Sequence, residues 1–143
     1  MLTSNPITGG TFMKMIIYLL MVTCLFAFWS CEKESKNAVE LSVDFSWEGI
    51  NQCGWGNPTI FLDNVPKNTK YIKIQMYDHA YAYDHGEVIM PFAGEKIIKN
   101  NRFDNIQGPC PPHQPGEYEV TIKTLDENKV VIGKGSKVRP FPE

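Results

Sequence analysis

The chain has 143 residues, with 14 Lys and Arg, 16 Asp and Glu and 3 His, and a net charge of −2 at neutral pH. This near balance argues against a nucleic-acid-binding protein, which would usually carry a basic patch. The length supports one domain with a modest hydrophobic core.

The first 30 residues are typical of an export signal. Lys14 is their only charge, and the chain is almost continuously apolar from Ile16 to Trp29. This run is short for a transmembrane helix but fits the apolar part of a signal peptide. Met13-Lys14-Met15 supplies the basic start of such a signal, so we expect translation to begin at Met13.

The junction after the apolar run carries a cysteine. Phe28-Trp29-Ser30-Cys31 resembles a bacterial lipobox and is followed by a charged stretch. By this resemblance Cys31 is the lipidated first residue of the mature protein, residues 31–37 are a tether and residues 38–143 the folded domain. The lipid would hold the protein at a membrane surface of the cell envelope without spanning it. An ordinary cleaved signal and a single anchor helix remain as alternatives.

Alternating apolar and polar residues predict a domain made of strands. Val39 to Trp47 alternates without interruption, which indicates a half-buried strand. The strands expected in chain order are residues 39–47, 59–62, 71–77, 87–92, 95–98, 117–124 and 129–137. Residues 78–86 and 100–115 are expected to be loops. Five to seven short strands without a convincing helix predict an all-β fold, either a β-sandwich or a partial barrel.

Two cysteines remain in the exported domain once Cys31 is set aside. Cys110 lies in the stiff, proline-rich loop 108–113, and Cys53 lies in an earlier Gly- and Asn-rich loop. Export places both in an oxidising compartment, where such a pair commonly forms a disulfide. The bond would close a loop of about 56 residues, worth about 4 kcal/mol in the chain-entropy model. Two free buried thiols are the competing interpretation.

Three separated segments of the chain stand out together. They are Cys53-Gly54-Trp55-Gly56-Asn57-Pro58 with Val65-Pro66, Gln75–Ala80 with His85–Val88, and Gly108-Pro109-Cys110-Pro111-Pro112 leading to Tyr118. In order and spacing they resemble the bacterial branch of the phosphatidylethanolamine-binding protein family. The resemblance covers about residues 53–126, and the third segment is its most specific part. It implies a β-sandwich of short antiparallel strands with long loops, in a divergent and shortened form.

The resemblance also implies a small pocket that accepts an anion or a lipid headgroup. Carried over by motif, the ligand-binding residues are Asp78, His85, Gly108, Pro109 and Tyr118. An imidazole and a phenol both donate hydrogen bonds to phosphate oxygens. The chain departs from the family pattern nearby: His79 stands in place of a proline, Gly86 of a tryptophan, Gly116 of a histidine and Glu117 of an arginine.

We therefore expect a lipid-anchored, non-enzymatic binding protein without a cofactor. The alternatives are a protein-interaction or inhibitor module that uses loops 78–86 and 100–115, or a domain that has lost the pocket. A third alternative, metal or hydrolytic chemistry, has little support. The three histidines (His79, His85 and His113) lie near acidic residues but lack metal-site spacing, and no serine has a nucleophile-elbow context. Tyr77, Tyr81 and Tyr83 either shape a ligand mouth or serve in packing.

Overall fold

The structure is a computed structural model that describes residues 32–112 and 115–142. Every strand named below belongs to one compact unit within residues 33–143. The signal, the lipidation residue Cys31 and His113 lie outside the described residues. Within the described part, no helix is long and apolar enough to cross a membrane.

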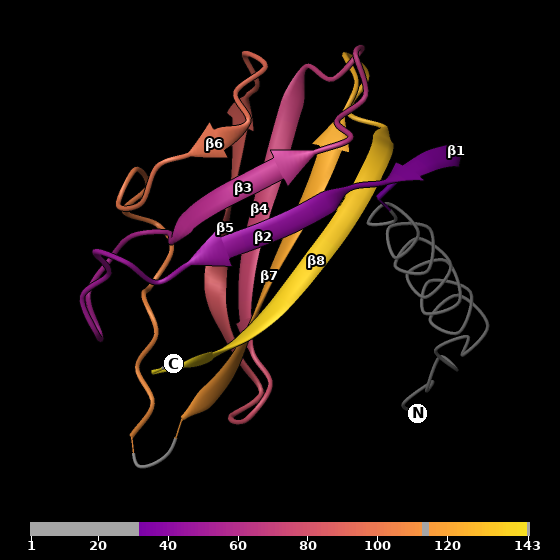
Figure 1. The fold of residues 1–143 in the computed structure, drawn as a ribbon. Helices are drawn as coiled ribbons and strands as arrows, with labels where there is room; N and C mark the ends of the chain where they lie inside the picture. Colours follow the sequence, from indigo (N-terminus) through magenta and orange to yellow (C-terminus); the bar gives the residue numbers. More distant parts are fainter. Residues whose placement is uncertain (1–31, 113–114, 143) are drawn as a thin grey trace, which may run out of the picture. The chain divides into compact units, whose positions relative to one another are not determined.

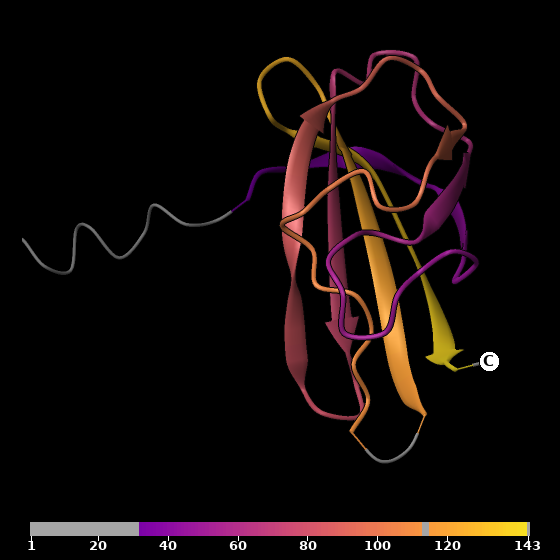
Figure 2. The same ribbon diagram turned by 90° about the vertical axis from the view of Figure 1, so that its left-hand side faces the viewer.

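The described residues form two β-sheets and contain no helix, which confirms the all-β prediction. The eight strands are β1 (Glu34–Glu40), β2 (Ser42–Ser46), β3 (Thr59–Asp63), β4 (Tyr71–Asp78), β5 (Tyr83–Pro91), β6 (Ile97–Ile98), β7 (Gly116–Leu125) and β8 (Val131–Phe141). The larger sheet has the order β1-β8-β7-β4-β5 and the smaller one β2-β3-β6. Figures 1 and 2 show the smaller sheet lying over one face of the larger sheet.

The first predicted strand is divided between the two sheets at Leu41. β1 pairs with β8 in parallel, whereas β2 pairs with β3 in antiparallel orientation. The amide of Leu41 donates to the carbonyl of Lys134 at 2.9 Å, where the chain passes over β8. A side chain at Gly135 would meet the Leu41 carbonyl at 2.5 Å, so a glycine is required beneath this crossing. β1 begins at Glu34, inside the segment expected to be a tether.

The core lies between the sheets and follows the predicted alternation. On β4, Ile72, Ile74 and Met76 are buried, while the residues between them are only partly covered. β7 repeats the pattern with Tyr118, Val120 and Ile122. Because alternate residues of a strand face opposite sides of the sheet, one face supplies the core and the other faces water.

The long segment 99–115 has no strand among its described residues, yet hydrogen bonds hold it against the loop that contains Asn57. The buried side chain of Asn57 donates from Nδ2 to the carbonyls of Pro58 and Lys99, and its Oδ1 accepts from the amides of Arg102 and Phe103. One asparagine thus satisfies four backbone groups of two loops.

The cysteine loops are joined as predicted by a Cys53–Cys110 disulfide, with the two Cα atoms 4.5 Å apart. Backbone hydrogen bonds support the junction: Cys53 donates to the Pro109 carbonyl at 2.9 Å and Gly108 to the Gly54 carbonyl at 2.7 Å. The competing interpretation, two free thiols, is therefore wrong. A disulfide of this kind indicates an oxidising compartment outside the cytoplasm.

Candidate functional site

A pocket lies at the end of the sandwich where β4 ends and β5 begins. It has a volume of about 310 Å³, at the lower end of the range for small-molecule sites. Its lining combines two strand ends, the β4–β5 turn and the proline-rich loop: Asp78, Tyr81, Tyr83, His85, Gln107, Cys110 and Pro112. In Figure 1 the β4–β5 turn and the loop leading to β7 both lie at the lower end of the domain.

Asp78 is the last residue of β4 and is almost completely buried. Its Oδ1 accepts hydrogen bonds from the amides of Ala80 at 2.8 Å and Tyr81 at 3.2 Å. Such side-chain bonds to the following backbone shape a tight turn. The carboxylate therefore fixes the turn that carries Tyr81 into the pocket lining.

Tyr118 lies beneath the pocket rather than in its lining, and its side chain is fully buried. The phenol donates to Asp78 and accepts from the amide of Cys110 at 3.2 Å. Burial, reinforced by the Asp78 carboxylate, raises the pKa of Tyr118. Since both roles of the hydroxyl are used inside the protein, Tyr118 connects β4 to the cysteine loop.

His85 is the buried imidazole of the pocket. Its Nδ1 lies 3.0 Å from the carbonyl oxygen of Gln107, a contact in which the nitrogen must donate. The neutral ring then carries its lone pair on Nε2. Burial lowers the pKa of His85, although the carbonyl of Gln107 and the charge of Asp78 act in the opposite direction. The ring packs edge-on against Tyr118, with centroids 5.3 Å apart.

Gly108 and Pro109 do not line the pocket but hold the loop behind it. Both are buried, and their backbone groups bond to Gly54 and Cys53 respectively. A side chain at Gly108 would meet the carbonyl oxygens of Gly54 and Asn51 at 3.1 and 3.2 Å. Glycine is therefore needed here for close contact between the two loops.

Two of the departures from the family pattern have a steric explanation. Gly86 has a φ of +108°, and a side chain there would meet the carbonyl oxygen of Asn105 at 2.4 Å. A side chain at Gly116 would meet the ring of Tyr118 at 2.6 Å. Loop 99–112 and the Tyr118 ring thus occupy the space that larger residues at these two positions would need.

Sequence reasoning did not identify Gln107 as a pocket residue. Its backbone carbonyl accepts a hydrogen bond from His85 Nδ1, and its Oε1 accepts one from the phenol of Tyr83 at 3.0 Å. That leaves the Gln107 amide nitrogen as a donor. A glutamine in a loop has no distinctive sequence pattern, and only its place just before Gly108 could have drawn attention to it. Tyr81 and Tyr83 do line the mouth, one of the two roles expected for them.

The acidic and histidine residues near the turn do not gather into a metal site. His79 pairs with Glu119 on the outer surface at 2.9 Å, and Asp84 accepts from the amide of Gly86. Among the described residues, no group of three or more His, Cys, Asp and Glu side chains could hold a metal ion.

Comparison with known proteins places the fold. No protein-family model matches the chain. No curated protein sequence matches it either. Among solved structures it is similar to Escherichia coli YbcL, described as a member of the mammalian PEBP family, with a TM-score of 0.51, 15% identity and coverage of 72% of this chain and 98% of that one.

A second similar structure is CT736 of Chlamydia trachomatis, described as a phosphatidylethanolamine-binding protein (PEBP) homologue. It gives a TM-score of 0.53 at 12% identity, over 76% of this chain and 99% of that chain. Both similarities span nearly the whole of the related chains. The domain therefore has the phosphatidylethanolamine-binding protein fold, in a divergent form.

Proposed function

We propose that the protein is an exported, lipid-anchored and non-enzymatic binding protein whose pocket takes a small phosphate-bearing headgroup. The observation that carries this proposal is the convergence of Asp78, His85 and loop 107–112 around one cavity. The loop is far in the sequence from Asp78 and His85, and the Tyr118 phenol joins its Cys110 amide to Asp78. The disulfide fixes the same loop to Cys53.

The charge of the pocket favours a zwitterion over a bare anion. Its described lining residues include no lysine or arginine, and Asp78 is their one carboxylate. A ligand amine would lie near Asp78, while the donors for a phosphate are the amide of Gln107 and, when the ring is protonated, Nε2 of His85. Phosphoethanolamine combines both groups, in keeping with the family for which the two similar structures are named.

Binding of phosphoethanolamine tests the ligand class. Isothermal titration of the full chain should show saturable binding that is at least about fivefold tighter than that of inorganic phosphate. His85→Asn keeps an amide donor close to the place of Nδ1 but removes Nε2, and should weaken binding at least about fivefold. His79→Asn, an exposed neighbour, is the matched control and should bind normally. Equal binding by all three proteins, or no saturable binding, would refute the proposal.

The absence of catalysis is part of the proposal. Cys110 is the one cysteine among the described lining residues, and its sulfur is held in the disulfide. A cysteine in this state has no thiolate to attack a substrate. Incubation with phosphodiester and carboxylate ester probes should release no product, and turnover that is lost in His85→Asn would contradict a purely binding role.

Export is supported by the disulfide, since such bonds persist in oxidising compartments. Anchoring rests on the resemblance of Phe28-Trp29-Ser30-Cys31 to a lipobox. Cys31 would then carry the lipid. Labelled palmitate should enter the wild-type chain and be absent from Cys31→Ala, which should be released from the membrane fraction. Equal labelling of both chains would exclude Cys31 as the lipidated residue.

A second candidate function is supported by exposed aromatic residues on the loops. Trp55, Tyr81 and Tyr83 are 65%, 44% and 50% exposed. Exposed aromatics of this kind are enriched in protein interfaces. An interaction module would lose its partner in an envelope pull-down when Trp55 and Tyr83 are replaced by serine. A pull-down that is unchanged by these replacements would exclude this role for the loops.

A further inference from the structure

A second cavity lies at the end of the sandwich opposite to the candidate site. It is formed by residues 62–69, which lead from β3 toward β4, and residues 92–96, between β5 and β6, and it has a volume of about 490 Å³. β4 starts beside this cavity at Tyr71 and ends in the candidate site at Asp78. Eight residues of strand span roughly 25 Å, so the two sites are separate.

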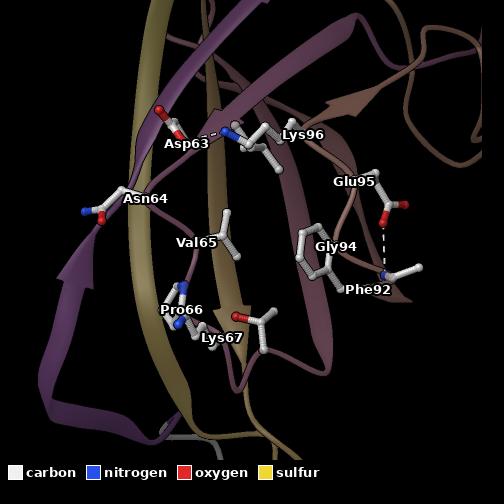
Figure 3. A pocket seen from close by; sticks show the side chains of 12 residues that line it. Asp63, Asn64, Val65, Pro66, Lys67, Phe92, Gly94, Glu95 and Lys96 are labelled. Carbon is white, nitrogen blue, oxygen red and sulfur yellow. Dashed lines mark hydrogen bonds and ion pairs between the residues drawn. The ribbon is translucent and has the colours of Figure 1, made fainter.

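One part of this cavity is apolar. Figure 3 shows the side chains of Val65 and Phe92 on opposite sides of the hollow, one from each loop. Both residues also pack against the hydrophobic core, as partly buried members of its edge. This packing gives the cavity an apolar wall that would cover the hydrocarbon part of a ligand.

One residue of the cavity lining carries a buried hydroxyl without a partner among the described residues. Thr69 lines the cavity and is only 8% exposed, and its Oγ1 makes no hydrogen bond with any described residue. Its backbone is satisfied, since the amide donates to the carbonyl of Pro66 at 3.1 Å. Leaving a buried hydroxyl unpaired is unfavourable, and a ligand oxygen that accepts a hydrogen bond from it would remove this penalty.

The charges around the cavity leave one cation uncompensated. Asp63 pairs with Lys96 at 3.3 Å, and Glu95 pairs with Arg102 at 3.0 Å. Lys67 has no ion pair with another described residue, and it belongs to the same turn as Thr69. The lining of the cavity therefore includes a hydroxyl and an ammonium from one turn, together with the apolar side chains of Val65 and Phe92.

We propose that this cavity binds a small monocarboxylate with an apolar body. The carboxylate accepts from the Thr69 hydroxyl and pairs with Lys67, while the apolar body lies between Val65 and Phe92. A single free cation suits one negative charge, whereas a phosphate monoester would bring nearly two. The site is independent of the function proposed above, because it uses other residues at the other end of the domain.

Titration with phenylacetate tests the proposal, with amide chemical shifts of the ¹⁵N-labelled full chain as the readout. Shifts should be confined to residues 62–69 and 92–96 and should saturate below about 10 mM. Phenylacetamide, the neutral isostere, should bind at least about threefold more weakly, since it lacks the charge that pairs with Lys67. No shifts, shifts only around His85, or equal binding of the two probes would each overturn the proposal.

The structure provides a matched control for the hydroxyl. Thr124 on β7 also has a buried, unpaired Oγ1 but does not line the cavity. Thr69→Val should weaken the binding of phenylacetate at least about threefold, and Thr124→Val should leave this binding unchanged. The Lys67→Gln variant should bind phenylacetate and phenylacetamide with equal affinity. If Thr69→Val and Thr124→Val bind phenylacetate equally well, the hydroxyl holds at most a water molecule and the assignment fails.

Discussion

Removing the Cys53–Cys110 disulfide should destabilise the domain chiefly through the unfolded chain. The perturbation is the double substitution Cys53→Ala and Cys110→Ala. Cys53 is exposed and Cys110 only partly buried, so the truncation removes little buried apolar surface. The backbone bonds between their loops, such as Cys53 to Pro109, do not depend on the sulfurs. The main effect is the loss of the closed loop.

The separation of the two cysteines sets the magnitude of this effect. For 57 residues the chain-entropy relation gives about 14 cal/mol/K, or about 4 kcal/mol at 25 °C. The unfolding free energy of a domain of this size is typically about 5–15 kcal/mol. The double variant should therefore remain folded, with an unfolding free energy of about 1–11 kcal/mol.

Urea unfolding followed by circular dichroism measures the difference. The wild-type chain treated with reductant should lose about as much stability as the double variant, and the variant itself should not respond to reductant. A loss below about 1 kcal/mol would refute the loop-closure reasoning. A similar loss in the reductant-treated variant would show that the effect does not come from this disulfide.

Three further predictions concern the neighbourhood of the pocket. Tyr118→Phe removes the phenol that donates to Asp78, and should lower the unfolding free energy by about 1–3 kcal/mol in urea; an unchanged midpoint would contradict this. Gly86→Ala should destabilise by at least about 1 kcal/mol, because its side chain meets the Asn105 carbonyl at a positive φ; a thermal melt that matches the wild type would contradict it. Burial lowers the pKa of His85 in the folded state, so the unfolded chain binds the proton first and stability falls as the pH drops below about 6.5. His85→Asn should remove this dependence between about pH 5 and 7, and a slope that persists would contradict its assignment to His85.

The sequence predicted strands well where they lie in the middle of a sheet. Residues 71–77 and 117–124 were expected and correspond to β4 and β7. Both pair with strands on each side, so alternation and burial coincide. Residues 39–47 also alternate, but the alternation does not show which sheet a strand joins. The crossing at Leu41 leaves no room for a side chain at Gly133 or Gly135 of β8, and both glycines are more than ninety residues away in the sequence.

The boundaries at the pocket were harder to predict. Residues 78–86 were expected to form a loop, yet β5 already starts at Tyr83. Its first residues are exposed and polar apart from His85, so the apolar alternation is lost there. The strand is instead held by backbone contacts, such as the amide of Gln107 donating to the His85 carbonyl at 2.8 Å. Backbone hydrogen bonds do not depend on the type of side chain, so the sequence pattern cannot predict them.

The candidate site was predicted in part. The resemblance led to Asp78 and His85, which line the pocket, and to Tyr118, Gly108 and Pro109, which support it from behind. Motif matching gives positions in the sequence and cannot distinguish a lining residue from a supporting one. Tyr118 is a supporting residue because its phenol already donates a hydrogen bond to Asp78 and accepts one from the amide of Cys110.

The imidazole nitrogen spectrum of His85 during titration with phosphoethanolamine tests most directly whether the pocket takes a headgroup. We expect a progressive shift of His85 Nε2, with Nδ1 remaining bonded to the Gln107 carbonyl and the ring of His79 unaffected. Unchanged His85 nitrogens at about 10 mM phosphoethanolamine, or equal shifts of His79 and His85, would contradict a headgroup pocket at this end of the domain.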